Sequence, residues 1–304
     1  LLLNKSVSHN RSKILSRKAS ALNNTGYIYL QQGLILDALD YYEKCLKIME
    51  DIGDRQGIAG TYNNIAGIYN NQGKIKEALN YYYKSLNIME EITDKNGISA
   101  SLNNIGFIYQ QQGQIKEALD YYSRSLKISE EIKDKHSIAT ALNNIGKVYT
   151  SKGQINQALD YYNRSLKIRE EMGEKRGIAI TLNNISNIFS KQGKINESLD
   201  YLRKSLRIRK EINDMPGIAS SQINMAGIYL KQKNNLLALS YSDSSITIAK
   251  AIGYPEIIRN AELMLAKIDS SRGNSAGAFE HYKLYIIYRD SIKNKENEKA
   301  AIRQ

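Results

Sequence analysis

The sequence is poor in the residues that build disulfides, metal sites and helix breaks. Among its 304 residues it has no tryptophan, one cysteine, two prolines and three histidines. The lone cysteine, Cys45, excludes a disulfide within the chain. The histidines lack the spacing of metal ligands, so we expect no metal and no cofactor. Because proline breaks helix interiors, a chain with only Pro216 and Pro255 can form long, uninterrupted helices.

The residue patterns of catalysis are also missing. The sequence has no glycine-rich phosphate loop and no nucleophile placed beside a base. Its acidic doublets, such as Glu130-Glu131, return with a fixed period and therefore belong to the scaffold. No apolar run reaches the length of a membrane span. We therefore predict that these residues do not form an enzyme, whatever domains lie outside them.

What the sequence does have is a repeat of 40 residues. An asparagine pair marks it most clearly, followed by a single Asn224 in the sixth repeat: Asn23-Asn24, Asn63-Asn64, Asn103-Asn104, Asn143-Asn144 and Asn183-Asn184. A glycine and, five residues later, an alanine or serine return with the same period. We count seven repeats, of which the last two are degraded, as terminal repeats often are. Such a period is typical of stacked helical units.

Each repeat contains two segments with helical periodicity. In the third repeat, Gly113 separates these segments as a helix C-cap would. The apolar face of the first segment holds Leu102, Ile105, Gly106 and Tyr109. The second segment has two adjoining apolar stripes: Ala118, Tyr121, Ser125 and Ile128, and beside them Leu119, Tyr122 and Leu126. A helix buried on two sides needs two neighbours, its own partner and the next repeat, so the pattern predicts a solenoid.

This repeat resembles the tetratricopeptide repeat, whose pattern runs bulky–x2–Leu–Gly–x2–Tyr, then alanine, an aromatic and a small residue. The matching residues are Leu102, Ile105, Gly106, Tyr109, Ala118, Tyr122 and Ser125. The usual repeat has 34 residues and a closing proline, whereas here the period is 40 and that slot holds glutamate, as at Glu130. We therefore expect longer helices and a longer turn between repeats. The long form is similar to repeats of spindle-orientation adaptors and kinesin light chains, and to sensory halves of bacterial histidine kinases and adenylate cyclases.

The predicted fold is all-α, an α-solenoid forming a right-handed superhelix of about seven helix pairs in one elongated body. Residues 1–16 are expected to be a leader, either disordered or the remnant of a signal or anchor segment. Residues 17–292 form the array, and residues 293–304 a charged helical extension. That extension either links the array to an output domain or serves as a solubilising cap. Cys45 occupies a slot that holds serine in the next four repeats, so we interpret it as a small packing residue.

The resemblance implies that the first helix of each pair lines a concave groove that binds ligands. Side-chain amides both donate and accept hydrogen bonds, so a ladder of them is suited to an extended peptide backbone. The first asparagine of each pair is the better candidate for the groove, and the second contacts either the ligand or the neighbouring repeat. The candidate peptide-binding residues are Asn23, Asn63, Asn103, Asn143, Asn183, Asn64, Asn104, Asn144, Asn70, Phe107, Gln110 and Gln111.

The first and second helices differ in their charged residues. The first helices of repeats one to three carry no lysine or arginine at the groove slots, which disfavours capture of an acidic C-terminus. The net charge of +12 and a pI near 9.4 permit binding of nucleic acid. Basic residues recur on the second helix, at Lys84 and Arg124 for example, with acidic neighbours and without interleaved base-stacking aromatics. We interpret this row as a solvated convex face.

The sequence thus predicts a non-catalytic scaffold that binds a protein or extended peptide, as the sensory or adaptor region of a bacterial signalling protein. The alternatives are nucleic-acid binding by the basic convex face and a purely structural assembly module. Self-association is compatible with such an array, and a membrane would be reached only through segments outside this chain. The sequence leaves the cytoplasmic and periplasmic sides of a bacterial membrane equally open.

Overall fold

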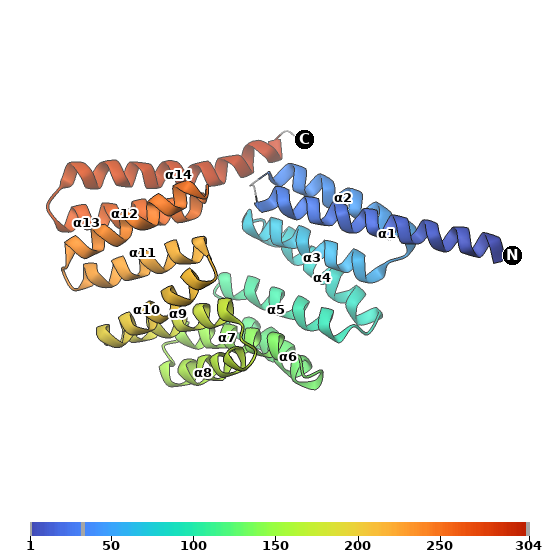
Figure 1. Cartoon of the computed structure of the whole chain (residues 1–304), viewed down its shortest axis with the longest axis horizontal. Coiled ribbons are helices and arrows are strands. Elements are labelled where there is room, and N and C mark those ends of the chain that lie inside the picture. The colour runs from blue at the N-terminus through green and yellow to red at the C-terminus, as the bar shows by residue number, and fades with distance from the viewer. Residues whose placement is uncertain (1, 32–33, 302–304) are drawn as a thin grey trace. The chain divides into compact units, whose positions relative to one another are not determined.

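The computed structural model describes residues 2–31 and 34–301. Over these residues the chain forms fourteen α-helices and no strand (Figure 1), as the helical periodicity predicts. The helices are α1 (Leu2–Gln31), α2 (Ile35–Ile52), α3 (Arg55–Asn71), α4 (Ile75–Glu91), α5 (Lys95–Gln111), α6 (Ile115–Glu131), α7 (Lys135–Ser151), α8 (Ile155–Glu171), α9 (Lys175–Lys191), α10 (Ile195–Glu211), α11 (Met215–Lys231), α12 (Asn235–Ala251), α13 (Pro255–Ser271) and α14 (Ser275–Ala301). Gly33, the first of the recurring glycines, lies outside the described residues.

The described helices follow one another in seven pairs, and an odd-numbered first helix precedes an even-numbered second helix in each. From α3 to α13 every helix has 17 residues. The connection between pairs, such as residues 92–94, is as short as the one within a pair, such as residues 72–74. The expected longer turn between repeats is therefore wrong, because the period of 40 comes from two equal steps of helix and short turn.

Two kinds of turn alternate along the chain. Within a pair, a glycine such as Gly113 adopts a left-handed φ of 73° and donates its N–H to the carbonyl of Gln110, as the C-cap prediction requires. Between pairs, an aspartate caps the next helix: the Asp94 carboxylate accepts from the Gly97 N–H at 3.2 Å. The same cap recurs at Asp54 and Asp214. Each cap satisfies one of the free donors at a helix start.

The chain divides into two compact units, residues 1–148 and residues 149–304, and the division falls inside α7. The uninterrupted repeat did not predict such a division. In the first unit, α1 is continuous from Leu2 through the expected leader into the first repeat. In the second unit, α14 continues to Ala301, beyond the expected end of the array at residue 292.

The core of each unit lies in the seams between successive repeats. In the first unit, Tyr82 and Leu86 of α4 pack against Ile105 and Ile108 of α5, and all four are buried. In the second unit, Leu199 and Leu202 of α10 likewise pack against Met225 and Ile228 of α11. Cys45 is buried, with its Sγ 3.6 Å from the Thr61 hydroxyl oxygen. The slot is therefore one of small packing residues.

Tyrosines at two repeat positions stack in pairs within the repeats. The rings of Tyr109 and Tyr121 lie 5.3 Å apart and are nearly parallel, and the same pairing recurs from Tyr29–Tyr41 to Tyr229–Tyr241. The second-helix tyrosine that follows the stacked ring is buried. Burial raises the pKa of the Tyr82 and Tyr162 hydroxyls to about 12, because the charged phenolate would lose its hydration. These side chains are core residues.

The start of each first helix fits the side chain that lies over it. A Cβ on Gly97 would collide with the Met89 side chain, and one on Gly177 with Arg169. In repeats where the position equivalent to Met89 holds a smaller residue, the position equivalent to Gly97 holds a residue larger than glycine. The two combinations are Ser129 with Ser137 and Ala249 with Ile257. Combined volume at this contact is therefore conserved from repeat to repeat.

Candidate functional site

The recurring asparagines join neighbouring first helices. In the first unit, Asn64 Nδ2 donates to Asn23 Oδ1 at 2.9 Å, and Asn144 donates to Asn103 at 3.0 Å. In the second unit, Asn224 donates to Asn183 at 2.8 Å. In each case the second asparagine of one repeat bonds to the first asparagine of the preceding repeat. In these three seams both members of the pair take part, and not the second member alone.

This bond explains an unfavourable residue in a helix. Each asparagine costs about 0.6 kcal/mol relative to alanine inside a helix. The two partners together cost about 1.2 kcal/mol, which one amide hydrogen bond of about 0.5–1.5 kcal/mol roughly offsets. An amide group has two N–H donors and an oxygen with two lone pairs. Asn23 and Asn183 use only their oxygen in the seam, so both of their N–H groups are left for another partner. The ladder is thus structural and still able to bind.

The other predicted residues differ in exposure and in hydrogen bonding. Asn104 is half-buried, Gln111 is exposed and Phe107 exposes 38% of its surface. Asn63 and Asn70 are half-buried, and each has a buried side-chain oxygen without a hydrogen-bond partner. Such an acceptor costs free energy until it is satisfied. These residues share one side of the first helices, which we call the first-helix face.

Three predicted residues are less available than expected. Asn143 and Asn144 expose only 4% and 8% of their surface, and Asn144 spends an N–H on Asn103. Both side chains are therefore largely buried in this structure. The side-chain oxygen of Gln110 accepts the buried Tyr122 hydroxyl at 2.8 Å, which gives it a structural role.

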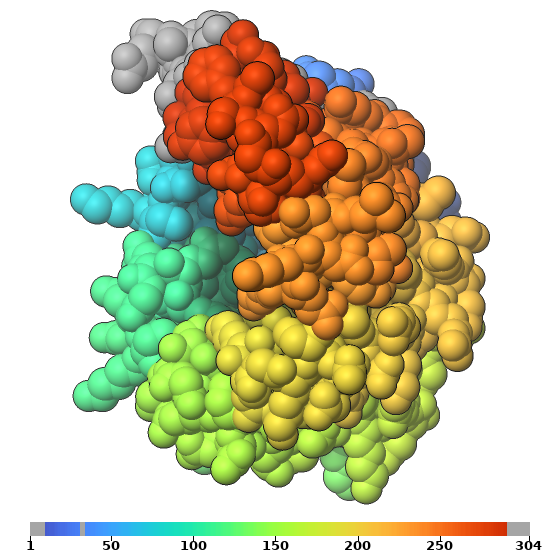
Figure 2. Space-filling view, turned by 90° about the vertical axis from the view of Figure 1, so that its left-hand side faces the viewer, coloured from blue at the N-terminus to red at the C-terminus, as the bar shows by residue number. Residues whose placement is uncertain are grey.

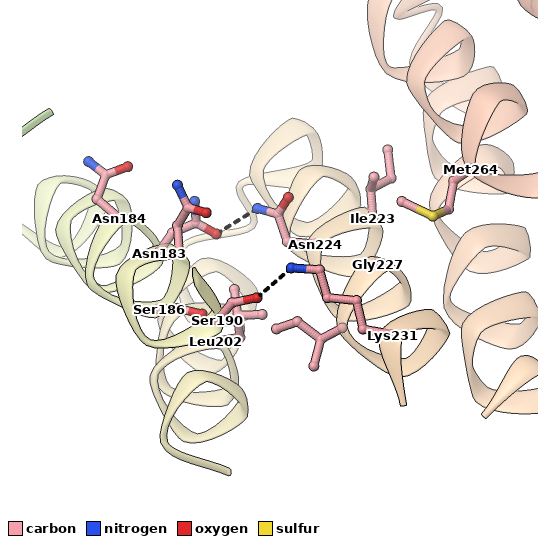
Figure 3. A pocket seen from close by; sticks show the side chains of 12 residues that line it. Asn183, Asn184, Ser186, Ser190, Leu202, Ile223, Asn224, Gly227, Lys231 and Met264 are labelled. Atoms are coloured by element: carbon pink, nitrogen blue, oxygen red, sulfur yellow. Dashed lines mark hydrogen bonds between the residues drawn. The ribbon is translucent and has the colours of Figure 1, made fainter. Parts of the chain in front are cut away.

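The second unit contains a hollow of about 360 Å³ on the first-helix face of α9, α11 and α13. Figure 3 shows Lys231 reaching toward Ser190, with Nζ 3.2 Å from Oγ, parallel to the bond between Asn224 and Asn183. Apolar side chains complete the lining. The hollow is lined by Asn183, Asn184, Ser186, Asn187, Ser190, Leu202, Ile223, Asn224, Gly227, Ile228, Lys231 and Met264.

A missing side chain opens this hollow. Gly227 occupies the slot that holds Phe107 in the third repeat and Asn187 in the fifth. Apart from the tip of Met264, no atom lies close to the position its Cβ would take. Of the lining residues, only Asn183 was among the predicted site residues. Asn187, Ser190 and Lys231 could have been found, because they fill the slots of Phe107, Gln110 and Gln111 in later repeats.

One row of basic residues on the second helices is already engaged. The Lys44 ammonium contacts Asp40 at 2.6 Å, and Arg124 contacts Asp120 at 3.8 Å. Lys44 and Arg124 also lie over the rings of the tyrosines three residues earlier, 5.1 and 5.4 Å from the ring centres. Tyrosine rings therefore accompany these two cations. Each ring is stacked on another tyrosine and covered by a cation, as in a solvated helix face.

Neither a metal site nor a membrane span is found in the described part of the chain. No group of three histidine, cysteine, aspartate or glutamate side chains there could hold a metal ion. No helix there combines the length and the apolar character needed to cross a membrane.

Fold and face together define an α-solenoid built from helix pairs. The family model of the tetratricopeptide repeat matches residues 17–91, 57–131, 97–171 and 137–211, which is more than half of the sequence. The chain belongs to the tetratricopeptide repeat family. No curated protein matches its sequence.

Solved structures share the fold at low sequence identity. The apo form of RapI has 19% identity and a TM-score of 0.69, over 91% of this chain and 99% of that one. A Rap protein complexed with competence and sporulation factor has 16% identity and a TM-score of 0.73, over 91% and 76%. Kinesin light chain-like repeats from Podosopora anserina have 15% identity and a TM-score of 0.51, over 66% and 98%. At such identities the likeness shows the fold alone.

Proposed function

We propose that this protein is a non-catalytic scaffold that binds an extended peptide, or an extended segment of a protein, on its first-helix face. The hollow of the second unit carries this proposal, because amide groups, a lysine and an apolar floor converge there. Ligand sites commonly combine an apolar lining with a few placed polar groups. Asn183 supplies free N–H donors, and Leu202 and Met264 supply apolar surface.

The spacing of the face suits an extended backbone. Helices in contact lie about 8–10 Å apart, and an extended peptide rises about 3.3 Å per residue. One step from helix to helix therefore corresponds to about three peptide residues. Asn183 and Asn187 on α9 and Asn224 on α11 offer amide donors and acceptors on the two sides of one such step. Affinity would come from the peptide backbone, and selectivity from the apolar floor and the charge of Lys231.

The comparisons support a peptide as the ligand class. Two proteins of similar fold were solved as complexes, a Rap protein with competence and sporulation factor and a Rap conjugation gene regulator with the Phr* peptide. Both are under 20% identical to this chain, so they support the class of ligand and not the contacts. By the resemblance to bacterial signalling proteins, we further propose that the array is a sensory or adaptor region. Ligand binding would then be transmitted through α14.

The test begins with selection of peptides from a displayed random library on the intact chain. Affinity of the selected peptides for the chain is then measured by fluorescence anisotropy. We expect Asn183→Ala, Asn187→Ala and Lys231→Ala each to weaken binding about tenfold, which corresponds to about 1.4 kcal/mol. The helical circular dichroism should not change, because these side chains are at least partly exposed.

The matched control is Asn163→Ala, the same exchange at an exposed site on the second helix α8. It should leave peptide affinity unchanged. Failure to select any peptide, or an equal loss of affinity in Asn163→Ala, would contradict peptide binding at this face.

A further inference from the structure

Several seams inside the chain follow one design. A stripe on the second helix, Leu79, Tyr82 and Leu86 in α4, packs against Ile105 and Ile108 of the next first helix. The seam from α2 to α3 uses leucine and tyrosine against two isoleucines in the same way. The seam from α8 to α9 has the same residue types, with leucine and tyrosine of α8 against two isoleucines of α9. Similar stripes therefore meet similar first-helix surfaces in these three seams.

The last helix carries this stripe without a cover. The slots of Leu79, Tyr82 and Leu86 hold Phe279, Tyr282 and Ile286 in α14. Phe279 exposes 65% and Tyr282 50% of its surface. Figure 2 shows the side chains of α14, in red, at the molecular surface. These aromatic side chains are therefore not covered by another described helix.

The first helix carries the complementary surface, also uncovered. Ile28 in α1 exposes 53% of its surface, whereas its equivalents Ile68 and Ile108 are completely buried. Thr25 occupies the slot of Ile105, and its hydroxyl donates to the Ala21 carbonyl of its own helix. The Thr25 hydroxyl is therefore satisfied and does not oppose an apolar contact.

We propose that these two surfaces bind each other between copies of the chain, with the α14 stripe of one copy on the α1 surface of the next. The contact repeats the seam that already joins α4 to α5, which is why a second copy is the partner that fits. It uses two different surfaces, so it is a head-to-tail contact that can repeat from copy to copy. The chain thus forms short linear assemblies whose length grows with concentration.

The experiment disrupts one of the two surfaces at a time. Ile28→Glu places a charge on the head surface, and Tyr282→Glu places one on the tail stripe. Both sites are exposed, so the fold should be kept, which circular dichroism and the melting temperature verify. In sedimentation velocity we expect the unchanged chain to shift to larger species from micromolar to millimolar concentration. Each blocked variant alone should remain a monomer.

An equimolar mixture of the two variants gives the sharpest result. Each supplies the end that the other lacks, so the mixture should form a dimer and nothing larger. Leu236→Glu, at an 82% exposed residue of α12 outside both surfaces, should assemble as the unchanged chain does. A chain that stays monomeric at millimolar concentration overturns the proposal. So does self-association of either blocked variant alone, since that would show a symmetric contact of like surfaces.

Discussion

Asn23 and Asn64 show at the scale of single residues why a poor helix former persists in these helices. Their hydrogen bond spans one repeat and lies in a half-buried seam. We expect a double-mutant cycle of Asn23→Ala and Asn64→Ala to give a coupling energy of about 0.5–1.5 kcal/mol. Urea unfolding measures it. Coupling is the right quantity, because each exchange for alanine also gains helix propensity. A coupling energy of zero would remove the structural role of the pair.

Tyr82 and Tyr162 predict a limit to alkaline stability. Their pKa in the folded chain is about 12, against an ordinary value of 10.0. The unfolded chain therefore loses these protons first as the pH rises, and the free energy of unfolding falls between pH 10 and 12. Below pH 10 the contribution is complete. Urea unfolding at a series of pH values measures this slope.

The control for this prediction is the double variant Tyr82→Phe and Tyr162→Phe. It removes both hydroxyl groups and keeps the rings, so the decline of stability between pH 10 and 12 should become shallower. An unchanged slope would show that other groups determine the alkaline limit.

At the scale of elements, the turns between pairs contain a strained position. Thr93 has a φ of 55°, in the left-handed region that disfavours β-branched residues, whereas the same slot holds Gly53 and Gly173 in other repeats. We expect Thr93→Gly to raise the free energy of unfolding by about 0.5–1 kcal/mol, because relief of strain exceeds the added chain entropy. Thermal unfolding tests this, and a lower melting temperature would contradict it.

The contact between α4 and α5 gives a second prediction for elements. Gly97→Ala should destabilise the chain by about 1–3 kcal/mol, because the added methyl group collides with Met89. In Met89→Ser the same exchange at Gly97 should cost much less, since Ser129 and Ser137 coexist at these slots in another repeat. Urea unfolding of the four proteins gives the comparison. Purely additive effects would show that the two volumes are independent.

The sequence predicts the elements well where a local rule determines them. The two helices of each repeat follow from apolar periodicity, and the turn at Gly113 follows from the need for a left-handed residue. The turn between repeats was expected to be longer. The turn is short because Asp94 caps the next helix, which therefore begins immediately after it. The pattern of apolar residues does not show where a helix is capped.

At the scale of the whole molecule, the order of seven helix pairs follows from the repeat, but the division inside α7 does not. The site was predicted only in part. The asparagine slots are visible in sequence, and so is their general place on the first helices. The hollow is not visible in the sequence. It arises because Gly227 has no side chain to fill the space between Asn187 and Met264, and the sequence does not show which residues surround that space.

The most direct test of the account fills this hollow without touching its polar groups. In Gly227→Leu the new side chain would extend into the hollow, and the atom nearest to its Cβ is the flexible tip of Met264. Gly60→Leu is the control, since nothing surrounds that position. We predict that a selected peptide titrated by calorimetry loses at least tenfold in affinity with Gly227→Leu and nothing with Gly60→Leu. Unchanged affinity in Gly227→Leu would contradict peptide binding at this site.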